Sequence, residues 1–450
     1  MASSKKTPVD AFAELKGPMT REEARIESSR CLYCYDAPCV TACPTHIDVP
    51  RFIRQIAAAD ALGSGETILE ANALGHSCAR VCPVEVLCEG ACVYHDWQEK
   101  PIQIARLQRH ATDAVYATGE PPFNPGKDNG KRVAIIGAGP AGASCAAYLR
   151  RLGFAVTIFE KRKLPGGLNT YGVAEYKMSQ PTAIEEMKFL FKLGCDVVTG
   201  KEVGKDVPIA DLTNDFDAVF VGIGLSDTRS LGIPGEELPG VMDALSFIER
   251  VKAKGGKGVP ASESTVVIGG GNTAIDATTQ SVRTGAAKVT LAYRRGAADM
   301  SAYDFEVLLA KTDGATILTN AVPKRIIGKT KVEGIEFADK TQIACDRVIK
   351  AIGQTKHFAL AKAFGLAQHE DGRLKVNADT LACSRVNIFA GGDAVNGGRE
   401  VVNAAADGKR AAWGIFRALF PGQPAPVDNA YWISTIDGRK VAPITPRSHS

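Results

Sequence analysis

The feature that most restricts the fold is a glycine-rich pattern that occurs twice. From residue 131, KRVAIIGAGPAGASCAAYLRRLGFAVTIFEK reads as a strand, a glycine-rich turn, a helix and a strand ending at Glu160. From residue 264, STVVIGGGNTAIDATTQSVRTGAAKVTLAYRR repeats this order, and its second strand ends at Arg294 and Arg295. A glycine turn between a strand and a helix is typical of dinucleotide-binding folds. The chain is therefore predicted to contain two Rossmann-like α/β domains in tandem.

Each of the three glycines in the first turn, GAGPAG, can be explained by a steric requirement of dinucleotide binding. Gly137 permits the tight turn, Gly139 lets the backbone approach a pyrophosphate, and Gly142 lets helix and strand pack closely. The free N–H groups of the helix N-terminus suit a phosphate, and Glu160 would accept a bond from a ribose hydroxyl. The alternative is a glycine turn without a ligand. The predicted contacts in this turn are Gly137, Gly139, Pro140, Ala141, Gly142 and Glu160.

The second turn is followed by basic residues where the first has an acid. Arginines at this place suit a 2′-phosphate, which favours NADP(H) over NAD(H). The same arginines could instead be solvated or form ion pairs. The residues predicted to bind this nucleotide are Gly269, Gly271, Asn272, Thr273, Ala274, Arg294 and Arg295.

A third glycine motif lies near the C-terminus. RVNIFAGGDAV reads as a strand that runs into Gly392 and Asp393, and a predicted helix, REVVNAAADGKRAAWGIF, follows. In flavoproteins with two nucleotides, this pattern closes the FAD domain, so that domain should be split around the nicotinamide domain. The LPGGLNTYG stretch should lie beside the isoalloxazine, because glycines permit close approach. Asp393 could instead be a helix cap. The further predicted FAD contacts are Gly166, Gly167, Leu168, Gly392, Asp393, Val401 and Val402.

Eight of the chain's 12 cysteines lie between residues 31 and 92. The run RCLYCYDAPCVTACPTH has the C-x2-C-x4-C-x3-C-P spacing of ferredoxin-type runs, and SCARVCPVEVLCEGAC has a second Cys-Pro. We therefore predict two [4Fe–4S] clusters. Two zinc sites of four thiolates are the alternative. Disulfides are disfavoured, because the N-terminus lacks the features of a signal peptide and cytoplasmic thiols stay reduced.

Helices are expected around the cysteines. Thr20 and Glu23 form a capping-box pattern before REEARIESSR, and PIQIARLQRHATDAVY has helical periodicity with Pro101 near its first turn. No alternating strand pattern precedes residue 130. The predicted domains are therefore a helical iron–sulfur domain (1–125), a discontinuous FAD domain (126–233 and 356–450) and an NAD(P)H domain (234–355).

Composition excludes several classes of protein. The net charge is only +4, so nucleic acid is not an expected partner, and no apolar run is long enough to cross a bilayer. A cytoplasmic protein is expected. The four cysteines outside the N-terminal region contain no CxxC pair, which excludes a redox-active dithiol. They are Cys145, Cys195, Cys345 and Cys383.

Together these motifs resemble the electron-input half of dihydropyrimidine dehydrogenase, its bacterial stand-alone small subunit, and the glutamate synthase small subunit. The resemblance rests on RCLYC, CPTHID, GAGPAG with Glu160, PGGL, GGGNTAID, YRR and AGGDAV. It implies an all-α iron–sulfur domain followed by two Rossmann-like domains, with the NAD(P)H domain inserted in the FAD domain. It also implies hydride transfer from NAD(P)H to FAD without a catalytic side chain, and electron transfer through the clusters to a partner.

The ligand assignment draws on the ferredoxin runs and on this resemblance. The cysteine before Pro44 crosses to another cluster in such runs. The first cluster is therefore assigned to Cys31, Cys34, Cys39 and Cys92, and the second to Cys43, Cys82 and Cys88. Its eighth ligand is Gln108 or Cys78. The resemblance favours the glutamine, whereas chemistry favours the thiolate.

CPTHIDVPRFI resembles the pyrimidine-reducing branch, and GVAEYKMSQ departs from the glutamate synthase pattern. The sequence has no FMN-binding barrel, so the expected partner is an FMN- and iron–sulfur-containing dihydropyrimidine dehydrogenase subunit. Alternatives are a glutamate synthase small subunit, an NAD(P)H:ferredoxin-type subunit, or a non-enzymatic cluster-based sensor. For the Pro-rich tail from Pro421, the expected alternatives are docking of a partner and an unstructured end.

Overall fold

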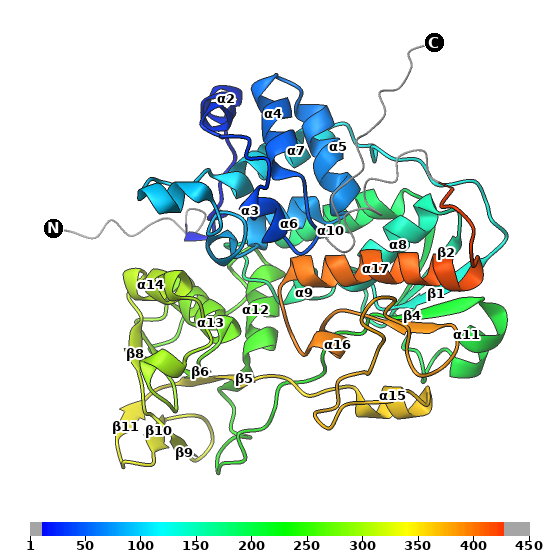
Figure 1. Ribbon diagram of the computed structural model, residues 1–450. Coiled ribbons are helices and arrows are strands. Elements are labelled where there is room, and N and C mark those ends of the chain that lie inside the picture. Colours follow the sequence, from blue (N-terminus) through cyan, green and yellow to red (C-terminus); the bar gives the residue numbers. More distant parts are fainter. Residues whose placement is uncertain (1–10, 427–450) are drawn as a thin grey trace. The chain divides into compact units, whose positions relative to one another are not determined.

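The computed structural model describes residues 11–426, which form two compact units (Figure 1). The first unit contains residues 11–15, 170–180 and 226–356. The second contains residues 16–169, 181–225 and 357–426. Most of the Pro-rich tail lies outside the described residues.

The N-terminal part of the second unit is helical, as expected, and no strand precedes residue 131 among the described residues. The predicted capping box is confirmed. The Glu23 N–H donates to Thr20 Oγ1 (3.2 Å), and the Thr20 N–H donates to Glu23 Oε2 (2.7 Å). The elements are α2 (Arg21–Ser29), α3 (Pro38–Thr41), α4 (Val49–Ala57), α5 (Ala61–Ala71), α6 (Gly75–Val81), η1 (Val84–Val86), η2 (Val93–Trp97) and α7 (Ile104–Tyr116).

Helix α7 begins at Ile104, so Pro101 lies just before its first turn, and the helix is shorter at its start than the segment with helical periodicity. The backbone N–H of Gln103 donates instead to the Glu27 carboxylate (2.9 Å), a contact between distant parts of the chain. Phe52, Ile53 and Leu107 are fully buried at the centre of this helical region. Partly buried cysteines pack against that core: Cys31, Cys39, Cys43, Cys88 and Cys92.

The same unit contains a parallel sheet with strand order β13-β4-β1-β2-β3. Strand β13 comes from the last segment of the unit and pairs with β4, with Ile388 opposite Val219. One sheet therefore combines chain segments from both sides of residues 226–356. The strands are β1 (Arg132–Ile136), β2 (Ala155–Glu160), β3 (Cys195–Thr199), β4 (Ala218–Val221) and β13 (Ile388–Ala390). The helices in this part of the sequence are α8 (Pro140–Arg151), α9 (Leu168–Tyr171), α10 (Gln180–Phe191), α11 (Ile209–Asp215), α15 (Phe358–Ala363), α16 (Asp393–Asn396) and α17 (Val401–Leu419).

Helices α8 and α17 lie side by side in close contact (Figure 1). A Cβ atom on Gly408 would stand 2.3 Å from the Ala141 carbonyl oxygen and 2.7 Å from the Cys145 nitrogen. The Ser144 hydroxyl donates to the Ala405 carbonyl (2.7 Å). Small residues therefore let the two backbones approach each other and hold the N-terminal half of α17 against α8.

The first unit has a second parallel sheet, of order β5-β12-β6-β7-β8, and an antiparallel sheet, of order β11-β10-β9. Strand β7 ends at Ala292, and the chain bends at Arg294 and Arg295. The prediction that this strand ends in the arginines was therefore two to three residues too long. The elements are β5 (Val241–Asp243), α12 (Ala244–Lys252), β6 (Ser264–Gly269), α13 (Asn272–Arg283), β7 (Lys288–Ala292), η3 (Ala297–Asp299), α14 (Asp304–Thr312), β8 (Thr316–Leu318), β9 (Pro323–Ile327), β10 (Gly334–Phe337), β11 (Gln342–Ala344) and β12 (Arg347–Ala351).

The backbone approach at Gly408 makes a testable prediction. Gly408→Ala should lower the free energy of unfolding by about 1–3 kcal/mol or more, because the added methyl meets backbone atoms that cannot rotate away. Thermal and urea unfolding of the whole chain would measure this. Gly17→Ala is the matched control, since nothing lies within 4 Å of its added methyl, and it should change stability little. Equal effects of the two substitutions would contradict the role given to Gly408.

Candidate functional site

The N-terminus of α8 is surrounded by glycine positions that the fold restricts. Gly137 has φ +96°, and a Cβ there would stand 2.5 Å from the Gly222 carbonyl oxygen. A Cβ on Gly142 would stand 1.9 Å from the Gly137 carbonyl oxygen. In contrast, a Cβ on Gly139 would meet no atom closer than the Gly167 Cα, at 3.8 Å. The first and third glycines therefore serve packing, and the second faces open space in front of the helix, where a pyrophosphate fits.

Two further glycine segments reach the same helix end. The Gly166 N–H donates to the Ala138 carbonyl (2.8 Å), and a Cβ on Gly167 would stand 2.9 Å from the Gly139 Cα. A Cβ on Gly392 would stand 3.0 Å from the Ala141 side chain. Three motifs far apart in the sequence thus meet at the start of α8.

The acidic and apolar residues predicted for this site lie around it. Glu160 is buried and accepts bonds from the Ala138 N–H (2.9 Å) and the Arg162 N–H (2.8 Å), which holds its carboxylate against the turn. Asp393 begins the short helix α16 and accepts a bond from the Arg399 N–H (3.2 Å). The remaining predicted residues occupy helix starts: Pro140 and Ala141 in α8, Leu168 in α9, and Val401 and Val402 in α17.

A buried polar chain that the sequence did not indicate begins at Asn169, in the segment that follows Gly166 and Gly167. Asn169 Nδ2 donates to Ser77 Oγ (3.0 Å), and Ser77 donates to Glu186 from its N–H (2.8 Å) and from its hydroxyl. Burial raises the pKa of Glu186 to about 7, although the bonds from Ser77 lower it. The three residues are distant in sequence and form no motif. Asn169 and Ser77 belong to segments that the sequence singled out for other reasons, and Glu186 belongs to none.

The thiols assigned to the first cluster lie together. Cys31, Cys34, Cys39 and Cys92 line one small cavity of about 30 Å³. Burial, reinforced by the other three thiols, raises the pKa of Cys39 to about 12. No three Cys, His, Asp or Glu side chains within residues 11–426 are placed to hold a single metal ion. Thiols arranged around a cavity suit a multi-iron cluster, which takes cysteine ligands at separate corners.

The second group of cysteines also gathers. Burial raises the pKa of Cys88, and the nearby Cys43, Glu89 and Cys82 raise it further. Cys82 is hydrogen-bonded to Cys78, and this contact together with burial raises the pKa of Cys82.

The two candidates for the eighth ligand occupy adjacent helices. Cys78 lies on α6, is almost fully buried, and contacts Cys82. Gln108 lies on α7, is 7% exposed, and donates from Nε2 to the Gly75 carbonyl (2.7 Å). The structure therefore brings the cysteine to the other thiols, and it orients the glutamine amide by a backbone bond.

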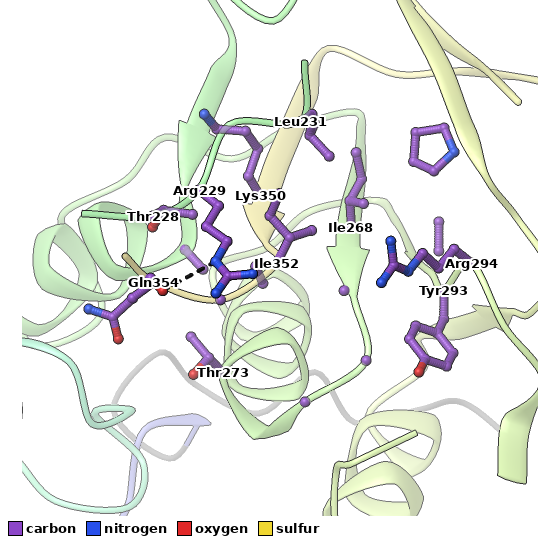
Figure 2. A pocket seen from close by; sticks show the side chains of 18 of the residues that line it. Thr228, Arg229, Leu231, Ile268, Thr273, Tyr293, Arg294, Lys350, Ile352 and Gln354 are labelled. Carbon is purple, nitrogen blue, oxygen red and sulfur yellow. Dashed lines mark hydrogen bonds between the residues drawn. The ribbon is translucent and has the colours of Figure 1, made fainter. Parts of the chain in front are cut away.

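The second glycine turn borders a pocket of about 680 Å³ within the first unit (Figure 2). Gly269, Gly271 and Thr273 line it at the start of α13, together with Arg294 and Arg295. A Cβ on Gly269 would stand 2.4 Å from the Ala351 carbonyl oxygen, so this glycine serves packing as well. The size is that of a ligand pocket, which typically measures about 300–1,000 Å³.

Two residues predicted to bind the nucleotide do not line this pocket. The Asn272 carbonyl oxygen Oδ1 accepts a bond from the Tyr303 N–H (3.0 Å), and Ala274 is fully buried. Both stabilise the start of α13.

Sequence reasoning missed the opposite wall of the pocket, where Arg229, Lys350 and Gln354 lie (Figure 2). Arg229 Nε donates to the Gln354 carbonyl (3.3 Å), and Lys350 forms an ion pair with Glu236 (2.8 Å). Burial would raise the pKa of Glu236, but bonds from Lys350, Ser230 and two backbone N–H groups lower it to about 2. Isolated basic residues in a loop and on a strand carry no recognisable spacing, so only the fold reveals this wall.

Comparison with known families agrees with this geometry. Residues 8–120 match the family described as dihydropyrimidine dehydrogenase domain II, 4Fe-4S cluster. Residues 131–408 match the family described as pyridine nucleotide-disulphide oxidoreductase. The chain belongs to the pyridine nucleotide-disulphide oxidoreductase family. It is an NAD(P)H-dependent oxidoreductase with flavin and iron–sulfur domains.

Two kinds of relative resemble this oxidoreductase over most of its length. The glutamate synthase [NADPH] small chain of Halomonas elongata is 34% identical, over 92% of this chain and 94% of its own. The NAD-dependent dihydropyrimidine dehydrogenase subunit PreT of Escherichia coli K12 is 35% identical, over 90% of this chain and 97% of its own. The expected resemblance to both groups is confirmed.

Solved structures share the fold of this oxidoreductase. FprA from Mycobacterium tuberculosis, in complex with NADPH, aligns with 68% of this chain and 90% of its own at 18% identity and a TM-score of 0.53. The thioredoxin reductase of T. acidophilum aligns with 64% of this chain and 98% of its own at 22% identity and a TM-score of 0.51. These similarities confirm the predicted fold class. None of the described helices combines the length and apolarity needed to span a membrane.

Proposed function

We propose that this chain is the electron-input subunit of a two-subunit enzyme. It would oxidise NAD(P)H and pass the electrons through FAD and two [4Fe–4S] clusters to an FMN-containing dihydropyrimidine dehydrogenase subunit that reduces uracil or thymine. The observation that carries the proposal is the presence of a dinucleotide cradle and both cysteine groups in one compact unit. Within this proposal, residues 1–125, 126–233 with 356–450, and 234–355 are the three functional domains.

The bound groups would supply the hydride and electron chemistry, and the side chains would supply placement. The open space at Gly139 would admit the FAD pyrophosphate, with Glu160 beside it for the ribose. The pocket along α13 would hold the nicotinamide nucleotide, with Arg294 and Arg295 near the ribose phosphate. No side chain is required as a catalytic acid, base or nucleophile.

The surface around the first cysteine group supports delivery to a separate partner. Cys31 and Cys34 are only partly buried, and the neighbouring Leu32 and Tyr35 are 46% and 92% exposed. Electron transfer slows steeply with distance, so a cluster close to the surface suits a docked acceptor. We further propose that the protein is cytoplasmic and has no nucleic-acid partner.

The choice of partner rests on CPTHIDVPRFI, which resembles the pyrimidine-reducing branch, and on GVAEYKMSQ, which departs from the glutamate synthase pattern. The glutamate synthase small chain is the second candidate, because relatives of that name are similar to the same extent. The third candidate function is that of an NAD(P)H:ferredoxin-type electron-transfer subunit.

The assay for this function uses the whole chain with its cofactors. NADH or NADPH oxidation should first be observed with an artificial dye. Uracil reduction should then require a co-purified FMN-containing dihydropyrimidine dehydrogenase subunit. If NAD(P)H oxidation instead supports glutamate formation from glutamine and 2-oxoglutarate when a glutamate synthase large subunit is added, the second candidate function is the correct one. Absence of dye reduction would contradict all three.

A second prediction concerns the choice of nucleotide. Replacing Arg294 and Arg295 by Gln should raise the KM for NADPH roughly ten- to a hundredfold and that for NADH much less. The reason is that charge-assisted bonds to a phosphate contribute about 1.5–3 kcal/mol. Steady-state kinetics with both nucleotides would measure this. Arg250→Gln is the control, because this exposed residue of α12 does not line the pocket. Equal effects on both nucleotides would contradict the phosphate contact.

A third prediction identifies the eighth cluster ligand. Redox-titrated EPR of Cys78→Ala and Gln108→Ala should show one cluster signal altered in only one of the two variants. A neutral amide in place of a thiolate makes the site more positive, so ligand identity shifts the potential. Cys145→Ala is the control, because this buried cysteine of α8 belongs to neither group. Unchanged signals in both variants would refute the assignment of the second cluster.

A further inference from the structure

Helix α17 carries a lysine that is almost fully buried. Lys409 is 1% exposed, and its ammonium donates to the main-chain carbonyls of Thr45 (2.8 Å) and Ala71 (2.8 Å). Both acceptors belong to the N-terminal helical region, and both residues are fully buried. The lysine head group is therefore held in the interior of the second unit, where α17 meets the cysteine-containing region.

The ammonium lies close to a cysteine assigned to the second cluster. Thr45 Oγ1 is 3.3 Å from Cys43 Sγ, and the carbonyl of the same threonine accepts from Lys409. These two contacts and the span of one threonine place the ammonium within about 10 Å of the sulfur. Helix α17 also contacts α6, which ends beside Cys82 (Figure 1). The lysine is thus a neighbour of the second cysteine group.

The two backbone bonds that hold this lysine leave its charge intact. Both acceptors are neutral carbonyl oxygens, so they orient the ammonium without neutralising it. Glu70, the residue before Ala71, accepts two bonds from Arg151 (3.0 Å and 2.8 Å). Burial lowers the pKa of Lys409 to about 7, and the nearby Cys43 raises it. Negative charge beside the lysine favours its protonated form, and a cluster with thiolate ligands supplies such charge.

A fixed positive charge changes the energetics of a nearby redox centre. Reduction adds an electron to a cluster, so the charge stabilises the reduced form more than the oxidised form. This effect requires proximity but no direct contact, because it acts through the electric field. Burial strengthens it, since the interior of a protein screens charges less than water does.

We propose that Lys409 determines the potential of the second cluster: its buried charge raises the midpoint potential and so favours reduction of that cluster. One electron leaves the donor cofactor and enters the cluster, and no bond to Lys409 forms or breaks. The inference rests on the cluster assignment in the proposed function.

The test is the midpoint potential of each cluster in the whole, cofactor-loaded chain, measured by redox-titrated EPR. Lys409→Met removes the charge at similar side-chain length. The second cluster should shift about ten- to thirtyfold toward its oxidised form, which is about 60–90 mV for a one-electron couple. The potential of the first cluster should change less. Cys88→Ser, which alters a proposed ligand of the second cluster, identifies its signal.

Lys252→Met is the matched control. Lys252 is likewise 1% exposed and donates to a main-chain carbonyl, that of Met178, but it lies on α12 in the first unit. Its replacement should leave both cluster potentials unchanged, and a shift equal to that of Lys409→Met would overturn the inference.

Two further variants separate the charge of Lys409 from its hydrogen bonds. Lys409→Arg keeps the charge, so the potential of its second cluster should stay close to that of the wild type. Lys409→Gln keeps a donor without the charge, so it should lower the potential as Lys409→Met does. If Lys409→Met fails to load its clusters, the comparison of Lys409→Gln with Lys409→Arg decides.

The outcomes separate this inference from the proposed function. Wild-type protein with iron for only one cluster would refute the cluster assignment itself. Cluster-loaded Lys409→Met and Lys409→Gln with wild-type potentials would overturn the inference and leave that assignment intact. Loss of the second cluster from all three Lys409 variants would also overturn it, because the lysine would then serve only to stabilise the fold.

Discussion

Close approach of backbone to backbone at the N-terminus of α8 is the constraint on which the candidate flavin site depends. The turn, the strand and α17 come so near that side chains at Gly137, Gly142 and Gly408 would overlap main-chain atoms. At Gly139, by contrast, an added Cβ would meet no atom closer than 3.8 Å. Because α17 and β13 follow the whole of residues 226–356 in the chain, the site forms only when both ends of the split sheet have paired.

Buried hydrogen bonds and ion pairs connect segments that are distant in sequence within each unit. In the first unit, Lys177 joins Asp276 of α13 (2.8 Å) and Glu306 of α14 (2.6 Å), so the segment 170–180 is tied to the helix that begins at the nucleotide pocket. In the second unit, Ser77 lies beside Cys78 on α6 and accepts a hydrogen bond from Asn169 of α9. Buried bonds of this kind specify one arrangement, because breaking them leaves unpaired groups away from water.

The cysteines of the helical region have two roles, because they pack against its core and are also the proposed cluster ligands. The helical region buries Phe52, Ile53 and Leu107 at its centre, and the cysteines pack against the outside of this core. A cluster bound there would cross-link segments from Cys31 to Cys92, so ligand binding and folding of this region should be coupled. The spacing of the cysteines is therefore a structural requirement as well as a chemical one.

Local patterns in the sequence determined much of this protein. The capping box at Thr20, both strand–turn–helix–strand units, the helical iron–sulfur region and the split sheet were all predicted, because each depends on neighbouring residues or on a motif of defined spacing. The start of α7, the end of β7, the basic wall at Arg229 and the chain from Asn169 to Glu186 were decided only by the tertiary structure. These features depend on contacts between residues tens to more than a hundred positions apart, such as Gln103 with Glu27 and Ser77 with Glu186. Such contacts leave no periodicity or spacing in the sequence, because the energy of a buried hydrogen bond depends on where the fold brings its two partners together.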